Sequence, residues 1–231
     1  MKETLATSGA KGFVLGLSGG KDSAVVAALA RQATENVLGL LLPCQSANSD
    51  REDALRLARH LNIATQEIDL EPAFVGARNS IRAVLGSIDP MAEANIKPRL
   101  RMLTLYATAQ TKGLLVAGTS NRSERVMGYF TKWGDSGCDI CPIADLTVRE
   151  VLLLGTALNV PEDILYKPPS AGLWPGQTDE QEMGIRYDTI DDFLLHGSAT
   201  EQDRATIERA YHRSEHKRSG VLFYRQMDML P

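Results

Sequence analysis

Glycines, hydroxyls, a lysine and an aspartate crowd into one short segment, Gly16-Leu17-Ser18-Gly19-Gly20-Lys21-Asp22-Ser23. It lies between an apolar run and a stretch of helical period. Glycines let successive backbone N–H groups converge, and a helix start adds its positive end. Lys21 adds a mobile positive charge, and the hydroxyls of Ser18 and Ser23 can donate hydrogen bonds to phosphate oxygens. The segment therefore predicts a site for pyrophosphate.

The spacing of this segment differs from that of the Walker phosphate loop. That loop needs four residues between its glycines and then Lys-Ser or Lys-Thr. Here three residues separate Gly16 from Gly20, and Asp22 stands between Lys21 and Ser23, so a P-loop NTPase is disfavoured. A carboxylate beside phosphates repels them unless a cation lies between, so Asp22 indicates Mg²⁺. The alternative, a tight Ser-Gly-Gly turn before an ordinary helix, stays open.

Apolar runs alternate with amphipathic stretches along the chain, which predicts an α/β fold with a doubly wound, mostly parallel sheet and flanking helices. The predicted strands are Phe13–Leu17, Val37–Leu42, Thr65–Leu70 and Leu114–Ala117. Four helices are predicted with both ends: Asp22–Ala33, Ile96–Lys112, Asp188–His196 before Gly197, and Glu201–Ser214. Two more begin at capping boxes, one at Ser49 that ends before Asn62 and one at Thr147. The helix Ile96–Lys112 is expected to have Ile96, Leu100, Leu103 and Ala107 on one face.

The composition is that of an ordinary globular protein. We expect the 231 residues, with a net charge of -4 and a pI of about 5.6, to form a single domain, 1–231. No global positive field draws in a nucleic-acid backbone, so we expect no nucleic-acid partner. The N-terminus has no apolar region and no run reaches membrane-spanning length. Together with only three cysteines, this predicts a cytoplasmic protein that binds no membrane.

Three further features have more than one interpretation. Cys138 and Cys141 form a Cys-x-x-Cys pair, but Pro142 follows at once, so two reduced thiols are favoured over a zinc or redox pair. His212 and His216 stand one helical turn apart, yet no third zinc ligand is obvious. The segment from Lys167 to Thr178 is rich in Pro and Gly, and is either a lid or a solvated connection.

The glycine segment resembles the Ser-Gly-Gly-x-Asp-Ser loop of the N-type ATP pyrophosphatases, in which the loop grips the β- and γ-phosphates while the α-phosphate is attacked. Within that superfamily, later segments resemble the ammonia-dependent NAD synthetases. These segments are Asn95–Met102, Gly118–Glu124, Gly128–Ile140, Lys167–Ala171, Tyr187–Phe193 and Glu215–Arg218. Several ordered motifs over such a span are more specific than any one of them.

This resemblance implies an adenine nucleotide α-hydrolase-like fold and a reaction. The nicotinate carboxylate of deamido-NAD attacks the α-phosphorus of ATP, and ammonia then displaces AMP from the adenylated acid to give NAD. The resemblance assigns ATP to Gly16, Leu17, Ser18, Gly19, Gly20, Lys21, Asp22, Ser23, Thr119 and Ser170, and Mg²⁺ to Asp22 and Glu124. It assigns deamido-NAD to Arg99, Lys132, Asp139, His216 and Lys217, a catalytic part to Lys21 and Asp22, and a homodimer as the assembly.

The chain departs from the family pattern in two places. A lysine that the family uses on ATP aligns with Val148, so Lys167 or Arg149 has to compensate or ATP binds more weakly. Only about a dozen residues precede the first strand, where the family has a further helical segment that contributes to the homodimer, so the resemblance leaves the dimer geometry open. The ammonia is expected to be free, because no glutaminase domain fits, although a separate glutaminase subunit stays open. Asp135 and Asp139 are both candidates to deprotonate ammonium.

Two rival functions remain at this point. One is another amidating or thiolating ATP pyrophosphatase that uses the same loop on a different acceptor. The other is a non-catalytic ATP-binding regulatory module on the same scaffold. Such a module has no need of Glu124 as a second acidic magnesium ligand.

Overall fold

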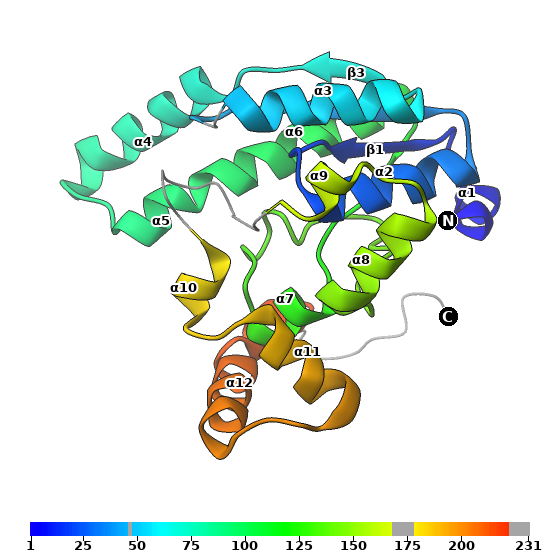
Figure 1. Cartoon of the computed structure of the whole chain (residues 1–231). Coiled ribbons are helices and arrows are strands. Elements are labelled where there is room, and N and C mark those ends of the chain that lie inside the picture. The colour runs from blue at the N-terminus through cyan, green and yellow to red at the C-terminus, as the bar shows by residue number, and fades with distance from the viewer. Residues whose placement is uncertain (46–47, 168–177, 222–231) are drawn as a thin grey trace, which may run out of the picture.

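The computed structural model describes residues 1–45, 48–167 and 178–221, and its centre is a four-stranded sheet (Figure 1). All its pairings are parallel, in the order β3-β2-β1-β4, with Phe13 opposite both Val37 and Leu115. The strands are β1 (Phe13–Gly16), β2 (Val37–Leu41), β3 (Ala64–Glu67) and β4 (Leu115–Val116). The predicted strands are confirmed, and β3 and β4 are shorter than expected.

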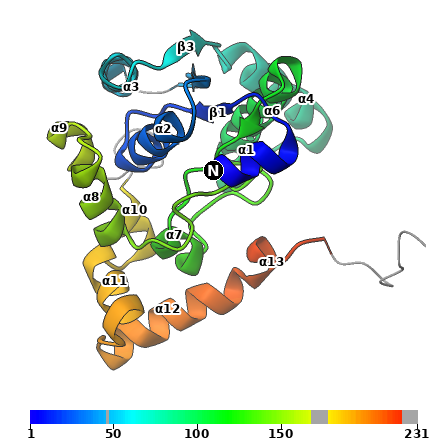
Figure 2. The same cartoon turned by 90° about the vertical axis from the view of Figure 1, so that its right-hand side faces the viewer.

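Helices cover both faces of the sheet because its central strands are apolar on both sides. Phe13 and Leu15 of β1 pack on one face, against α2 (Lys21–Ala33), α3 (Asn48–Leu61), α8 (Val148–Ala157) and α9 (Glu162–Leu165). Val14, between them, points to the other face, against α4 (Glu71–Leu85) and α6 (Ile96–Lys112). Figure 2 shows α2 and α3 on one side of β1 and α4 and α6 on the other. The predicted doubly wound architecture is confirmed.

A second, smaller group of helices lies below the sheet in Figure 1. It consists of α7 (Arg122–Met127), α10 (Asp179–Met183), α11 (Tyr187–His196), α12 (Glu201–Arg213) and α13 (Glu215–Arg218). Its own core holds Met127, Ile190 and Ile207. Two further short helices are α1 (Lys2–Ser8) and α5 (Pro90–Ala94). No helix among the described residues combines the length and apolar character that crossing a bilayer requires.

Several helix predictions are confirmed in detail. Helix α8 begins after Thr147, whose hydroxyl accepts from the Glu150 amide while the Glu150 carboxylate accepts from the Thr147 amide, as in a capping box. Helix α11 ends at Gly197, which has φ 70°. Helix α6 has the predicted ends, since Gly113 stops it.

The buried face predicted for α6 is partly wrong. Ile96 and Leu100 pack against the sheet, but Leu103 is 60% exposed and Ala107 is exposed as well. Tyr106 and Ala109 take the inward positions instead. The predicted start of α3 at Ser49 is also wrong, because that helix begins at Asn48. The sequence reading missed α4, a largely exposed helix in which Phe74 is buried.

Candidate functional site

The glycine loop turns the chain from β1 into α2 and is held by its own serines. Ser23 Oγ donates to the Gly20 carbonyl at 3.0 Å and lies 3.0 Å from Ser18 Oγ. Gly19 has φ 76°, and a Cβ there would lie 2.4 Å from the Asp50 carbonyl oxygen of α3. A side chain is therefore excluded at Gly19. Because first-turn amides have no partner within the helix, the start of α2 presents donors to an anion.

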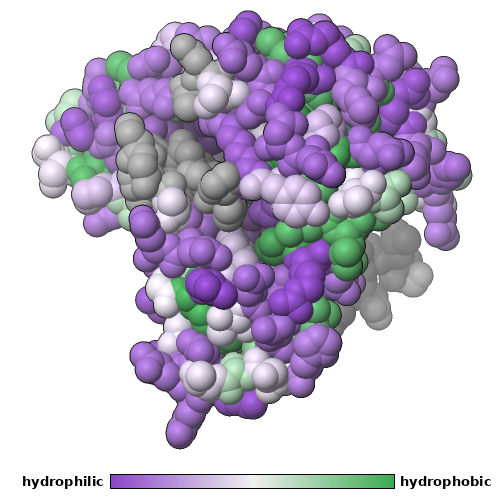
Figure 3. Space-filling view, in the orientation of Figure 1, coloured by the Kyte–Doolittle hydropathy of each residue, from purple (hydrophilic) through white to green (hydrophobic). Residues whose placement is uncertain are grey.

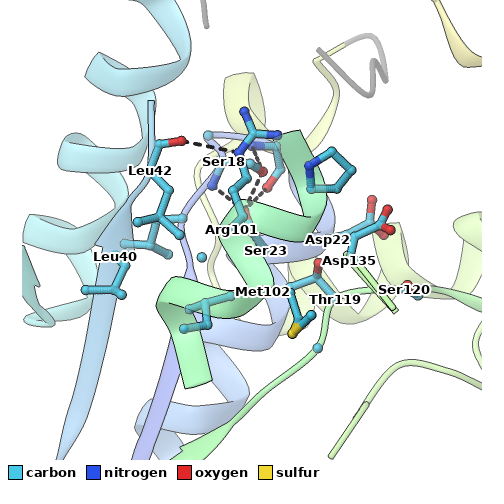
Figure 4. Close-up of a pocket in the computed structure, with 18 of the residues that line it drawn as sticks. Ser18, Asp22, Ser23, Leu40, Leu42, Arg101, Met102, Thr119, Ser120 and Asp135 are labelled. Carbon is cyan, nitrogen blue, oxygen red and sulfur yellow. Dashed lines mark hydrogen bonds between the residues drawn. The ribbon is translucent and has the colours of Figure 1, made fainter. Parts of the chain in front are cut away.

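A cavity of about 390 Å³ lies over this loop (Figure 4). Arg101 and Met102 of α6 line its opposite wall, and Arg101 Nε donates to the Leu42 carbonyl at 3.2 Å. The predicted ATP residues that the structure describes, Gly16 to Ser23 and Thr119, all line this cavity. Ser170, and with it residues 168–177 of the predicted lid, lies outside the described residues. The cavity therefore brings the predicted ATP set together at the carboxyl ends of β1, β2 and β4.

Lys21 and Asp22, at the start of α2, form a close ion pair. Lys21 Nζ lies 3.0 Å from Asp22 Oδ2, and Lys21 is 6% exposed. Burial alone lowers the pKa of Lys21, but the carboxylates of Asp22 and Glu124 outweigh burial and raise the pKa above its usual value. Lys21 Nζ also lies 5.5 Å from the centroid of the Tyr187 ring. Lys21 is therefore held cationic beside the glycine loop.

Asn121 joins the two carboxylates predicted for magnesium. Its side-chain amide donates to Asp22 Oδ1 at 3.1 Å, and its backbone amide donates to Glu124 Oε2 at 3.1 Å. Asn121 Oδ1 in turn accepts from the Glu124 amide at 2.9 Å, which caps α7. Burial, and then repulsion from Asp22, raise the pKa of Glu124 well above its usual range. Two ionised carboxylates this close repel each other, and a cation bound between them would relieve that repulsion.

Mg²⁺ fits this donor set. Mg²⁺ is usually held by one or two carboxylates together with substrate phosphates and water, rather than by a cage of protein ligands. Asp22 and Glu124 provide the two carboxylates beside a loop suited to phosphate. In residues 1–45, 48–167 and 178–221, no three or more His, Cys, Asp or Glu side chains form a metal cage.

Two polar residues of the same cavity region were missed by the sequence reading. Asp179, at the start of α10, is 4% exposed, lines the cavity and accepts from the Tyr187 hydroxyl at 3.2 Å. Burial, and then the charge of Glu124, raise the pKa of Tyr187. Asp179 and Tyr187 come from a segment about 150 residues beyond the glycine loop, and no local pattern links them to it.

The residues predicted for the dinucleotide lie outside this cavity, and their polar atoms contact the protein's own backbone. Arg99 donates to the Lys132 carbonyl at 3.3 Å, and Lys132 donates to the His216 carbonyl. Lys217 Nζ donates to the Gly128 and Phe130 carbonyls, at 2.7 and 2.8 Å. Asp139 accepts from the Val116 amide at 2.7 Å and from the Tyr106 hydroxyl at 3.2 Å. Contacts link Arg99, Lys132 and His216 to one another, and four of the five residues have structural contacts of their own.

The two residues considered as replacements for the missing lysine, Arg149 and Lys167, differ in whether their side chains face the cavity. Val148 is buried in the core of the smaller group of helices. Arg149 turns outward, with its guanidinium 2.9 Å from Asp192. Lys167 lines the cavity and its ammonium donates to Asp50 and Asp53 of α3, at 2.8 and 2.7 Å.

The disfavoured zinc pair finds no support in the structure. His212 belongs to α12 and His216 to α13, with a break at Ser214 between them. Both imidazole-bearing residues are exposed.

Comparison with known proteins places the chain in a family. The model of the family described as NAD synthase matches residues 1–221. The chain belongs to the NAD synthase family. The NH(3)-dependent NAD(+) synthetase of Carboxydothermus hydrogenoformans is 46% identical over 94% of this chain and 90% of its own. This membership does not favour the two alternative functions, which are a non-catalytic ATP-binding regulatory module and another amidating or thiolating ATP pyrophosphatase.

Solved structures support the same membership. The NMN synthetase of Francisella tularensis superposes with a TM-score of 0.91 at 42% identity, covering 96% of this chain and 92% of its own. The NH3-dependent NAD synthetase of Campylobacter jejuni, solved in complex with a nitrate ion, gives 0.78 at 32% identity, covering 97% and 93%. The chain thus has the fold of the solved NAD synthetases, as predicted.

Proposed function

We propose that this member of the NAD synthase family catalyses the ATP-dependent amidation of deamido-NAD to NAD, with free ammonia as nitrogen donor and AMP and pyrophosphate as products. A carboxylate acylates poorly because its leaving group would be oxide. Adenylation turns that leaving group into AMP, so the protein needs mainly to position reactants and neutralise phosphate charge. The observation that carries the proposal is the glycine loop beside the carboxylate pair in one cavity.

At the nucleotide end of the site, each of a few groups would have a separate role. The amides at the start of α2 and the hydroxyls of Ser18 and Ser23 would hold the β- and γ-phosphates. Lys21, kept cationic by its neighbours, would stabilise the leaving pyrophosphate. Asp22 and Glu124 would hold Mg²⁺, which supplies positive charge to the departing phosphates. Thr119 would contact ATP from the end of β4.

Lys167 is proposed as the replacement for the lysine that Val148 displaces. Its ammonium faces the cavity from the side of α3, while Arg149 points away. The ion pairs with Asp50 and Asp53 lower the pKa of the Asp53 carboxyl and hold the lysine in place. Lys167→Met should then raise the KM for ATP, whereas Arg149→Met should leave it unchanged.

Asp135 is proposed as the group that accepts a proton from ammonium. Its carboxylate lines the cavity and accepts from the Thr131 amide at 2.6 Å. Desolvation raises the pKa of the Asp135 carboxyl and the hydrogen bond from Thr131 opposes that rise, while the residue itself remains exposed to solvent and so to ammonium. Asp139, the other candidate, already accepts from a backbone amide and a tyrosine.

The remaining roles follow the family resemblance. Deamido-NAD would be bound by Arg99, Lys132, Asp139, His216 and Lys217. We also propose that residues 1–231 act as one domain, in the cytoplasm, without a nucleic-acid or membrane partner.

A homodimer is proposed through the outer face of α4 and α6. Apolar side chains are exposed there: Val84 is 84% exposed, Leu85 69% and Leu103 60%. Large exposed apolar side chains on neighbouring helices are typical of interfaces. Leu103→Glu with Val84→Glu should give a monomer in sedimentation. Hydrophobic side chains also gather over α8 (Figure 3), so Leu153→Glu is a matched control that should stay dimeric.

A second candidate is the amidation of the corresponding mononucleotide, nicotinate mononucleotide. It is supported by the NMN synthetase of Francisella tularensis, whose TM-score of 0.91 exceeds the 0.78 of the Campylobacter NAD synthetase. The chemistry at the α-phosphate is the same for both acids. Only the adenylate half of the acceptor differs, so kcat/KM for the two acids decides between them.

One assay tests the proposal. The protein is mixed with ATP, Mg²⁺, ammonium and each acid in turn, and AMP and the amide are measured. Stoichiometric AMP and NAD support the proposal, and AMP with NMN alone supports the second candidate. Release of ADP, or tight ATP binding without turnover, contradicts both.

A further inference from the structure

Cys138 and Cys141 bring two thiols together against the backbone of the nucleotide site. Both residues are half-buried, and their thiols are in hydrogen-bond contact. A Cβ placed on Gly118 would lie 2.6 Å from Cys138 Sγ and 3.5 Å from Cys141 Sγ. Both sulfur atoms therefore press on Gly118, the residue before Thr119.

We propose that Cys138 and Cys141 form a reversible dithiol–disulfide site, which hydroperoxides oxidise and whose oxidation weakens nucleotide binding. The disulfide does not depend on the proposed activity. Its effect on ATP rests on the proposed function of the cavity.

The two thiols differ in the way such a reaction requires. The contact with the Cys141 thiol, opposed in part by burial, lowers the pKa of Cys138, while the same contact raises the pKa of Cys141. The Cys138 thiolate attacks one peroxide oxygen, the O–O bond breaks, and a sulfenic acid and hydroxide form. Cys141 then attacks that sulfur, the S–O bond breaks, and water leaves with the thiol proton. The two thiols lose two electrons and the peroxide gains them.

Metal binding is a weaker explanation of the same pair. A structural zinc site needs four ligands, and in the part of the chain that the structure describes no three His, Cys, Asp or Glu form a metal site. The pair lies in a loop and not at the start of a helix, so no helix N-terminus lowers the pKa of Cys138. The neighbouring Cys141 thiol is what lowers that pKa.

The backbone around the pair leads directly to the nucleotide site. The Gly118 amide donates to the Ile140 carbonyl at 2.8 Å, and the Asp139 amide to the Val116 carbonyl at 2.9 Å. The Cys141 thiol donates to the Ser120 carbonyl at 3.2 Å. A disulfide removes that donor and draws Cys141 toward Cys138. Residues 119 to 121 then lose the hydrogen bond that holds the Ser120 carbonyl. They include Thr119, the proposed ATP contact, and Asn121, which joins the two carboxylates.

The experiment oxidises the full-length protein with hydrogen peroxide, blocks free thiols by alkylation and measures intact mass and ATP affinity. We expect loss of two hydrogen atoms without oxygen gain, ATP affinity roughly tenfold weaker, and recovery of both with dithiothreitol. Cys44→Ala is the matched control, because Cys44 is 0% exposed, and it should behave as wild type.

Two variants separate the roles. Cys141→Ser should stop at a sulfenic acid on Cys138, which dimedone traps, and Cys138→Ser should form neither product. Retention of both thiols, or oxidation of Cys44 in their place, contradicts the site. A disulfide with unchanged ATP affinity contradicts the switch. Because the mass readout needs no turnover, failure of the proposed function remains distinguishable from failure of the disulfide.

Discussion

The two ends of the proposed site are built in different ways. At the nucleotide end, one contiguous segment and a few partners converge on a cavity, with Lys21, Asp22 and Asn121 tightly connected. At the acceptor end, residues from distant segments bind each other's backbone: Lys217 holds the Gly128 and Phe130 carbonyls. The first end is arranged to act on charge, and the second is arranged to keep its shape.

This difference predicts different consequences of mutation. Substitutions of the charged side chains that would bind metal or phosphate at the nucleotide end should lower kcat with little effect on folding. Changes at the acceptor end should first lower stability and only then affect substrate binding.

Asp22→Asn should produce the largest effect, a fall in kcat of about 10³-fold, because the metal loses a charged ligand. Asparagine can still accept from the Asn121 amide, and Lys21 still faces Glu124, so the melting temperature should change little. Steady-state kinetics and thermal melting measure both. Asp188→Asn, at an exposed position, is the control and should retain wild-type kcat. A kcat for Asp22→Asn within tenfold of wild type contradicts the metal assignment.

Gly19→Ala should lower the free energy of unfolding by about 3 kcal/mol, from strain at positive φ and from overlap with Asp50. The new Cβ would lie 2.4 Å from a backbone oxygen, which cannot move aside as a side-chain end can. Gly184→Ala separates the two causes: φ there is 67° and nothing lies within 4 Å, so only about 1 kcal/mol should be lost. Urea denaturation compares them. Equal losses would mean that the contact with α3 contributes nothing.

Lys217→Met should lower the free energy of unfolding by about 2 kcal/mol, because two carbonyls lose a charged donor. A half-buried lysine that only bound substrate would behave differently: the substitution would raise KM for the acceptor and leave stability unchanged. Lys132→Met is the matched variant, since its ammonium contacts one carbonyl of an exposed residue. Denaturation and KM, measured on both variants, show whether the acceptor end is primarily structural.

The same division explains what the sequence could predict. The glycine loop, the strands and the caps are local patterns, and a buried parallel sheet gives continuous apolar runs that are easy to recognise. The Asn121–Glu124 spacing is also a local signal, that of a helix cap, although the link to Asp22 is not. Asp179 and Tyr187 reach the cavity only through tertiary packing. The face of α6 was misjudged because Leu103 fits the helical period but faces away from the sheet.

Glu124→Gln should give the smallest effect and the opposite sign for stability. The pKa of Glu124 is raised in the folded protein, so between the unfolded value and the folded one the folded state binds more protons. Stability therefore falls as pH rises through that window, and the full penalty is present above it. Glutamine carries no charge yet still accepts from the Asn121 amide, so it removes the penalty. The metal-free variant should melt roughly 2 to 4 °C higher than wild type at neutral pH.

The pH and metal dependence separate this explanation from a simple packing gain. In EDTA, the melting temperature of wild type should fall relative to the variant as the pH rises above the ordinary range of a glutamate carboxyl, because only wild type loses the proton. Mg²⁺ with ATP should reverse the order, since the cation stabilises the ionised carboxylate that glutamine lacks. A constant difference at all pH values, or equal stabilisation of both proteins by Mg²⁺ and ATP, would show that Glu124 is only a helix cap. The contrast between a reactive nucleotide end and a structural acceptor end would then depend on Asp22 alone.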